Sequence, residues 1–176
     1  AGLSYLRKKL GYDSFVCPSR TWLGTVTPAV MAGQRVHLID TPNCLGFELD
    51  QLQQASERLK NRRSVICNVD LMGFSAQHSD IQDFVHSHMS DSVYVVDAAE
   101  SLGSIVDNKP SAAFGLFSTI SFNATKIVTS TIGGALLTDD DDLFEYASSF
   151  KNNFIHVSKS GKQIFSQALG TNSNYS

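Results

Sequence analysis

The chain reads VVDAAESLGS over residues 95–104. The apolar residues at its start are typical of a buried strand, and Asp97 falls where that strand would end. A second distinctive stretch reads SFNATK over residues 121–126, which places Lys126 just after another apolar run. A strand-end aspartate and a lysine after a strand are each common in α/β proteins. Their meaning therefore depends on the fold around them and on their combination.

Strands and helices are predicted to alternate along the whole chain. Apolar and alternating runs predict strands at residues 14–17, 35–40, 64–69, 93–96, 117–122 and 134–138. Amphipathic segments predict helices at residues 3–10, 21–32, 49–59, 80–89 and 140–150. This alternation predicts an α/β domain whose mostly parallel sheet is covered by helices on both faces. Ligands of such sheets bind beyond the carboxyl ends of the strands, so Asp97 is a candidate site residue.

Three local features have ordinary structural explanations. Pro28 is expected to distort the helix predicted there or to mark its start. The four aspartates at residues 139–142 suit the positive end of a helix dipole, which we favour over a metal site. His86 and His88 are two residues apart and would not share a helix face, so they do not indicate a metal site.

Composition limits the class of protein. The chain has 176 residues, of which 42% are hydrophobic and 18% charged, as in one ordinary globular domain. The net charge of -3 argues against broad nucleic-acid binding. Cys17, Cys44 and Cys67 form no CxxC pair and are expected to be reduced thiols of a cytoplasmic protein. No apolar run approaches the length of a membrane span, and the first residues do not have the order of a signal peptide.

The two stretches together resemble the DegT/DnrJ/EryC1/StrS family of aminotransferases, which use pyridoxal 5'-phosphate (PLP) and act on nucleotide-linked sugars. That family carries Asp-Ala-Ala-Gln/Glu after a central strand and then Ser-Phe-x-x-x-Lys. Three further segments match its pattern, namely CPSRTW at residues 17–22, the strand at residues 32–40 and LGTN at residues 169–172. The resemblance covers nearly the whole chain. It implies fold type I, a three-layer αβα large domain with a mostly parallel sheet.

The ends of the chain lead to an expectation about its extent. The chain does not begin with Met, and it ends at Tyr175 and Ser176 without a predicted closing element. With the resemblance, this predicts that residues 1–176 are the PLP-binding large domain of a longer protein. That domain would lack its N-terminal stretch and the small C-terminal domain. The usual phosphate-binding start of the first helix would then lie before Ala1.

The resemblance assigns the central chemistry to two residues. Lys126 matches the lysine that forms the Schiff base with PLP and then moves a proton as a general base. Its alternative is a solvated surface lysine. Asp97 matches the carboxylate that pairs with the pyridine nitrogen and keeps the ring protonated, which makes the ring a better electron sink. Its alternative is a residue that caps a strand end.

Four further residues are expected to bind the cofactor by the same resemblance. Trp22 would stack on the pyridine ring, unless it is a core residue. Ser121 would bind the phosphate, with Thr125 as a second candidate. Glu100, where many members carry Gln, would lie near the ring hydroxyl. Asn172 matches an asparagine that reaches the phosphate of a neighbouring subunit, which implies a homodimer with shared active sites; otherwise it is an exposed loop residue.

The implied reaction is the transfer of an amino group from an amino acid, glutamate in the family, to a keto sugar linked to a nucleotide diphosphate. The sequence departs from the family pattern at Asp70, where His is frequent, at residues 129–134, and at Asn174. These departures bear on substrate identity. A sugar dehydratase of the same family is an alternative, although such enzymes replace the lysine by histidine. A catalytically incomplete PLP-binding fragment is another. A nucleotide-binding domain without PLP is disfavoured because the chain has no GxGxxG or P-loop motif.

Overall fold

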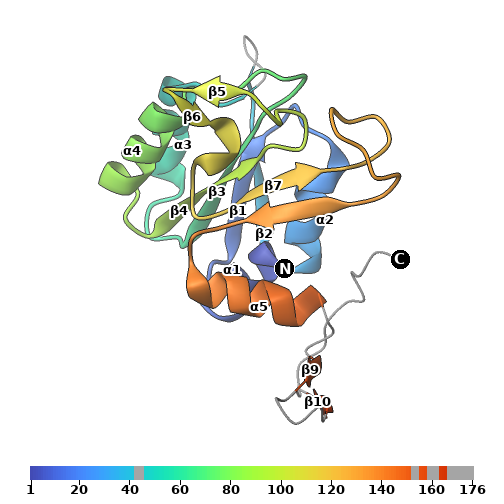
Figure 1. Cartoon of the computed structure of the whole chain (residues 1–176). Coiled ribbons are helices and arrows are strands. Elements are labelled where there is room, and N and C mark those ends of the chain that lie inside the picture. Colours follow the sequence, from blue (N-terminus) through green and yellow to red (C-terminus); the bar gives the residue numbers. More distant parts are fainter. Residues whose placement is uncertain (42–45, 152–154, 158–162, 166–176) are drawn as a thin grey trace.

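A computed structural model of the chain describes residues 1–41, 46–151, 155–157 and 163–165 (Figure 1). Cys44 and Asn172 lie outside these ranges, and so does the predicted LGTN segment. For residues 155–157 and 163–165 the description extends to the backbone only. In the described part of the chain, no helix combines the length and the apolar character that a membrane crossing requires.

The centre of the molecule is a six-stranded sheet in the order β2-β1-β3-β4-β7-β8. Its strands are β1 (Ser14–Pro18), β2 (Arg35–Ile39), β3 (Ser64–Val69), β4 (Ser92–Asp97), β7 (Ser118–Ser121) and β8 (Gly134–Leu137). Neighbours pair in parallel from β2 through to β7, whereas β8 pairs antiparallel with β7. The predicted mostly parallel sheet is confirmed, with β8 as its antiparallel edge strand.

Helices cover both faces of this sheet. They are α1 (Gly2–Lys8), α2 (Leu23–Met31), α3 (Leu49–Arg58), α4 (His78–His88) and α5 (Asp141–Lys151). Helices α3 and α4 lie over one face, while α1, α2 and α5 lie over the other (Figure 1). The predicted three-layer arrangement is therefore confirmed. The strand–helix alternation of the sequence produces it because the crossovers from β1 to β2, from β2 to β3 and from β3 to β4 each place one helix on a face of the sheet.

Side-chain alternation along the strands builds a separate core on each face. On the α3–α4 face, Val16 and Ile66 pack with Ile81 and other apolar side chains. On the opposite face, Phe15 and Val65 do so with the α1, α2 and α5 residues. Successive residues of a strand point to opposite faces, so a doubly covered strand is apolar throughout. Strands β1 and β3 are buried at every position, including their polar residues Ser14, Ser64 and Asn68.

Two cysteines occupy the strands predicted for them. Cys17 in β1 and Cys67 in β3 are buried and carry free thiols. Burial, and then the nearby Asp97 carboxylate, raises the pKa of Cys17 to about 12. Burial also raises the pKa of Cys67 well above that of a free thiol. Both side chains are therefore protonated at neutral pH and act as small apolar core residues.

Several elements differ from the sequence prediction. Pro28 lies inside α2, so the predicted alternative that it marks the start of the helix is wrong. A short hairpin of β5 (Ile105–Val106) and β6 (Lys109–Pro110) precedes the 3-10 helix η1 (Ser111–Ala113), and none of these was predicted. A second antiparallel pair consists of β9 (Ile155–Val157) and β10 (Gln163–Phe165). The aspartate run begins α5 as predicted, and Asp140 caps it by accepting a hydrogen bond from the Leu143 backbone N–H.

Candidate active site

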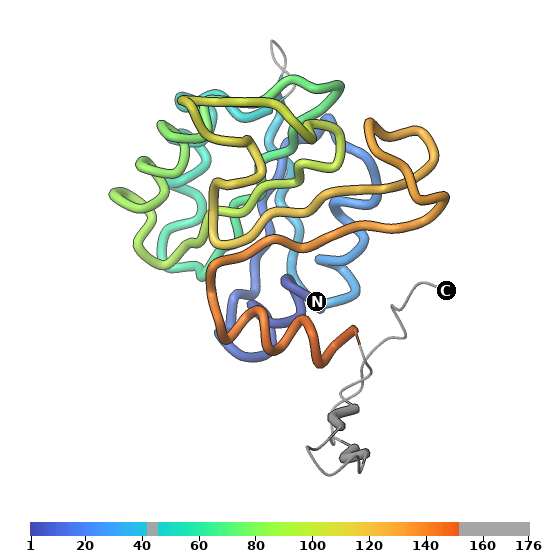
Figure 2. Tube along the Cα trace, viewed as in Figure 1, coloured from blue at the N-terminus to red at the C-terminus, as the bar shows by residue number. Residues whose placement is uncertain are grey.

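The candidate residues follow strands whose carboxyl ends share one edge of the sheet. Strand β1 ends at Pro18, shortly before Trp22, and β4 ends at Asp97. Strand β7 runs parallel to β4 and ends at Ser121. The connection from β7 to β8, residues 122–133, carries Lys126 and projects beyond the ends of those strands (Figure 2). In the strand order, β1 lies between β2 and β3. The order in which successive strands are added to the sheet therefore reverses between β1 and β3, and open α/β sheets bind ligands at such a switch point.

Asp97 is a half-buried carboxylate with partners on both oxygens. Thr25, in the first turn of α2, donates a hydrogen bond of 2.6 Å to Oδ2. The backbone N–H of Ala99 donates to Oδ1 over 3.2 Å, and Thr119 lies 3.5 Å from the same oxygen. Thr21 in turn hydrogen-bonds to Thr25 at 2.8 Å. These contacts fix the carboxylate on the face of the sheet covered by α2.

Lys126 and Glu100 form an ion pair at this edge. Lys126 Nζ lies 2.7 Å from Glu100 Oε1, and the two side chains are 21% and 33% exposed. The other carboxylate oxygen, Oε2, accepts a hydrogen bond of 2.9 Å from the Met72 backbone N–H. The Lys126 hydrogen bond, and after it the Met72 N–H, lowers the pKa of Glu100. The lysine amine therefore faces a fixed carboxylate, and Lys126 is not an unattached surface lysine.

Trp22 lies on the surface and not in either core. Its side chain is 78% exposed, at the N-cap position of α2. The backbone of Gly24 lies close beneath the indole, because a Cβ on Gly24 would lie 3.1 Å from Trp22 Cδ1. The alternative that Trp22 is a core residue is therefore wrong. An exposed indole beside the strand ends leaves a flat aromatic face available to a ligand.

Two hydroxyl candidates lie at the start of the connection that carries Lys126. Ser121 is half-buried, and its Oγ accepts a hydrogen bond of 3.3 Å from the Asn123 backbone N–H. Thr125 is exposed and hydrogen-bonds to the Asn123 side chain through both its N–H and its hydroxyl, each at 3.4 Å. Both hydroxyls are thus held by local turn contacts.

The structure joins only some of the predicted residues directly. Among the described residues, a hydrogen bond joins Glu100 to Lys126, and none joins any other pair of the candidates. Asn172 falls outside the described residues, so its predicted role stays a prediction. Within the described ranges, no group of three His, Cys, Asp or Glu side chains is arranged to hold a metal ion.

Sequence reasoning missed two partners of the candidate carboxylates. Thr25 anchors Asp97, and the Met72 N–H anchors Glu100. Thr25 stands in no motif, and a backbone N–H leaves no mark in a sequence. Met72 has a φ of 54°, a left-handed conformation that is uncommon outside glycine. The following Gly73 also has positive φ, and Gly73 was the only visible hint of a tight turn.

Comparison with known proteins identifies the family of the chain. A sequence model of the DegT/DnrJ/EryC1/StrS aminotransferase family matches residues 3–176. EpsN of Bacillus subtilis, assigned as a pyridoxal phosphate-dependent aminotransferase, is 33% identical over 140 residues, which are 77% of this chain and 35% of EpsN. A GDP-4-keto-6-deoxy-D-mannose 3-dehydratase of Escherichia coli is 26% identical over 75% of this chain and 33% of its own.

Solved structures share the fold. PseC of Helicobacter pylori, an aminotransferase involved in the biosynthesis of pseudaminic acid, superposes with a TM-score of 0.83 at 23% identity. The superposition covers 97% of this chain and 46% of PseC. This chain thus spans about a third of the length of EpsN and less than half that of PseC.

Proposed function

Because the chain belongs to the DegT/DnrJ/EryC1/StrS aminotransferase family, we propose that it is the cofactor-binding part of a PLP-dependent nucleotide-sugar aminotransferase. The observation that carries this proposal is the placement of Lys126, paired with Glu100, on the same sheet edge as the strand-end carboxylate of Asp97. PLP enzymes use a lysine for covalent attachment and a partner for the ring nitrogen, and a fixed carboxylate can be that partner.

The side chains at this edge of the sheet are chemically suited to PLP. Asp97 can accept a hydrogen bond from a protonated ring nitrogen, and the indole of Trp22 is free to stack on a flat ring. Ser121 Oγ accepts one hydrogen bond within the protein, so its own hydrogen can be donated to a phosphate. When bound, PLP supplies a carbonyl that captures amines and a ring that accepts electrons from the substrate carbon.

The protein residues have distinct tasks in this proposal. Lys126 would hold the cofactor through its amine, and the same amine could act as the general base that moves a proton at the substrate carbon. Glu100 could keep its hydrogen bond from Met72 while the oxygen that now faces Lys126 served the ring hydroxyl. Asp97 would stabilise a positive charge on the ring nitrogen, and Thr25 keeps that carboxylate oriented.

We infer the substrates from the relatives. Those most informative are a UDP-4-amino-4,6-dideoxy-N-acetyl-beta-L-altrosamine transaminase of Helicobacter pylori and a GDP-perosamine synthase of Escherichia coli O157:H7. We infer that the amino donor is an amino acid, glutamate by the family pattern. The acceptor is then a keto sugar attached to a nucleotide diphosphate.

A sugar dehydratase is the second candidate, because a dehydratase is also among the relatives. Lys126 favours the aminotransferase. A dehydratase of this family has histidine in that position, and an imidazole, unlike a lysine amine, cannot form a Schiff base with a carbonyl. The presence of Lys126 opposite Glu100 is thus the feature that separates the two proposals.

The extent and assembly of the enzyme complete the proposal. We propose that residues 1–176 are the large domain of a cytoplasmic homodimer, in a longer chain that also has an N-terminal stretch and a small C-terminal domain. The relatives are longer than this chain by more than a factor of two, which supports the presence of these parts. In the homodimer, Asn172 would reach the cofactor phosphate of the partner subunit.

Covalent trapping tests the assignment. The protein is mixed with PLP, reduced with sodium borohydride and digested, and the modified peptide is identified by mass spectrometry. The proposal predicts one phosphopyridoxyl group on Lys126. Lys126→Ala should lose it, whereas Lys109→Ala, which removes an exposed lysine on β6, should keep it. Label spread over surface lysines, or label retained in Lys126→Ala, would contradict the assignment. Conversion of the bound cofactor by glutamate then separates an active protein from an incomplete fragment that only binds PLP.

A further inference from the structure

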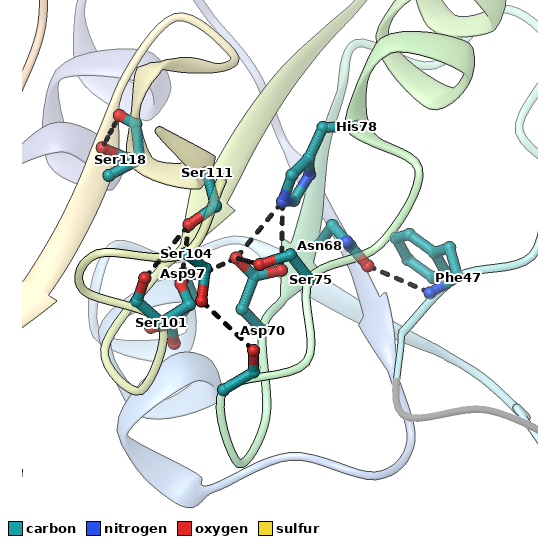
Figure 3. Close-up of polar contacts among 12 residues, drawn as sticks. Phe47, Asn68, Asp70, Ser75, His78, Asp97, Ser101, Ser104, Ser111 and Ser118 are labelled. Carbon is teal, nitrogen blue, oxygen red and sulfur yellow. Dashed lines mark hydrogen bonds and ion pairs between the residues drawn. The ribbon is translucent and has the colours of Figure 1, made fainter. Parts of the chain in front are cut away.

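A buried polar cluster of Asp70, His78, Ser101 and Ser111 lies at the α4 face of the sheet (Figure 3). Its centre is the carboxylate of Asp70, which is 1% exposed and directly follows β3. Asp70 Oδ2 accepts hydrogen bonds from Ser101 at 2.8 Å and from Ser75 at 3.2 Å. A buried carboxylate is costly unless its oxygens are hydrogen-bonded, so these contacts hold their partners in place.

His78, in the first turn of α4, completes the surroundings of Asp70. Its Nε2 lies 3.1 Å from Oδ1 and 3.2 Å from Oδ2 of Asp70, and its Nδ1 lies 2.7 Å from the Tyr94 hydroxyl. A carboxylate can only accept, so Nε2 carries the hydrogen. Burial, and then the Asp70 charge, raises the pKa of Tyr94 well above its usual value, so the phenol stays protonated and can donate to Nδ1.

Asp70 connects the two loops that meet at Glu100. The Met72 loop, residues 70–76, contains Ser75 and provides the N–H that Glu100 accepts. The Glu100 loop, residues 98–104, contains Ser101, the residue next to Glu100. Both serines donate to the same oxygen of Asp70. The Asp70 carboxylate therefore holds both the loop that contains the donor, the Met72 N–H, and the loop that contains the acceptor, the Glu100 carboxylate.

Further contacts make this connection rigid. Ser101 also hydrogen-bonds to the Ser111 hydroxyl at 2.9 Å, and Ser111 is itself 1% exposed. Ser104 donates to the Gly73 carbonyl at 3.2 Å, which adds a third direct link between the two loops. Neither loop can shift without breaking a buried hydrogen bond, and such a break leaves an unsatisfied polar group at a cost.

We propose that Asp70 is a positioning residue of the active site: through Ser75 and Ser101 it holds the Glu100 carboxylate facing Lys126. The residue is not catalytic, since its carboxylate is enclosed by His78 and the two serines on the opposite face from Asp97. Asp70 acts indirectly: it sets the orientation of the Glu100 carboxylate, and that carboxylate pairs with the Lys126 amine. The importance of this effect for catalysis rests on the function proposed for Lys126.

The test uses the full-length protein without cofactor and measures two quantities. One is the pKa of the Glu100 carboxyl, followed by NMR with isotope-labelled glutamate. The other is the rate at which an amine reagent, trinitrobenzenesulfonate, modifies Lys126, followed by peptide mass spectrometry. Ser101→Ala cuts the link to the Glu100 loop but keeps the Asp70–His78 pair. Asp70→Ala removes the whole connection and is the stronger but less stable variant.

In Ser101→Ala, the pKa of Glu100 should rise toward that of a free glutamate, because Lys126 and the Met72 N–H are no longer held against it. Lys126 modification should accelerate about threefold to fivefold, the range that a partly exposed ion pair allows. Ser14→Ala is the matched control. Ser14 is a buried serine that also donates to a carboxylate, that of Asp13 at 3.1 Å, but at the opposite end of the strands.

An unchanged Glu100 pKa and an unchanged Lys126 rate in folded Ser101→Ala would overturn the proposal. Equal changes in Ser14→Ala would overturn it too, since the effect would then come from general loss of stability. The measurement involves no PLP, so it can be told apart from a failure of the proposed function. Failure to trap PLP on Lys126 would remove that function but would leave the Glu100 and Lys126 measurements valid as evidence on positioning.

Discussion

Thr25 donates a 2.6 Å hydrogen bond to the Asp97 carboxylate and so joins the first turn of α2 to the end of β4. The two residues are 72 positions apart in the sequence. Helix α2 follows Trp22 directly, so the same contact also sets where the indole lies relative to Asp97. One hydroxyl thus couples the proposed ring-stacking residue to the proposed ring-nitrogen partner.

Thr25→Val should weaken both stability and PLP binding. Valine has nearly the shape of threonine but cannot donate, so one Asp97 oxygen loses its strongest partner. We expect a loss of about 1 kcal/mol in the free energy of unfolding and a PLP dissociation constant raised about fivefold. Urea denaturation and a PLP titration measure the two. Thr21→Val is the control because it removes only the Thr21–Thr25 bond; similar losses in both variants would argue against a special role for the Asp97 contact.

Glu100→Gln should reduce the loss of stability in acid. The pKa of Glu100 is lowered in the folded state, first by the Lys126 hydrogen bond and then by the Met72 N–H. A lowered carboxyl pKa stabilises the fold above the group's ordinary value of 4.5, and this stabilisation is lost as the pH falls through the lowered folded-state value. The side chain is about a third exposed, so we expect an effect below about 1 kcal/mol between pH 7 and pH 3.

The measurement is the free energy of unfolding in urea at both pH values. Glu57→Gln is the matched control, since Glu57 pairs with Lys60 on the surface, where both side chains are about two-thirds exposed. The native protein and Glu57→Gln should show nearly the same pH dependence, and Glu100→Gln a shallower one. Parallel curves for all three proteins would contradict the assignment of the Glu100 shift.

Asp140→Ala should destabilise the protein through loss of the α5 cap. Asp140 Oδ1 accepts the Leu143 backbone N–H at 2.7 Å, which satisfies one of the free donors of the first helical turn. Removing such a cap costs about 1 kcal/mol. Asp139→Ala, a change at the exposed neighbour, should cost much less. Chemical denaturation of both variants decides the matter, and equal losses would mean that the acidic run acts only through its overall charge.

Gly115→Ala should be strongly destabilising. The residue has a φ of 76°, and a Cβ there would lie 2.7 Å from the Tyr94 carbonyl oxygen, an atom of β4. Gly103 has a φ of 92° but open space around it, so Gly103→Ala isolates the conformational strain. We expect about 1 to 2 kcal/mol for Gly103→Ala and about 3 kcal/mol or more for Gly115→Ala. Thermal or urea unfolding measures the stability of the two variants. If Gly115→Ala lost no more stability than Gly103→Ala, the backbone of β4 would have moved to accommodate the added Cβ at little cost.

The sheet and its helices could be predicted because the spacing of apolar residues along the sequence follows which faces of each element are buried. Strands β1 and β3 are mostly apolar, and both are buried along their whole length. The hairpin of β5 and β6 was not predicted because two-residue strands are too short to show an alternation of apolar and polar residues. Its turn residues, Asp107 and Asn108, both have positive φ, and only the enrichment of Asp and Asn in that conformation hinted at it.

Site residues could be predicted where the side chain itself supplies the reactive group, as the amine of Lys126 does. Lys126 and Glu100 were named as separate candidates, and their ion pair could not be foreseen because 26 positions separate them. The Asp70 cluster was missed for a similar reason. Asp70, His78 and Ser101 are ordinary residues, and only the folded loops bring them to one buried point. Sequence marked Asp70 as a departure from the family pattern without showing its partners.

The antiparallel pairing of β8 with β7 also has a consequence for the order of folding. The lysine-bearing connection joins two strands that are neighbours in both sequence and space, so it is a local hairpin. The Thr25–Asp97 contact instead requires distant segments to meet. Local contacts form faster than distant ones. We therefore expect amides of the hairpin to gain protection in pulsed hydrogen exchange before those of α2; simultaneous protection would show that the two halves of the site form in one step.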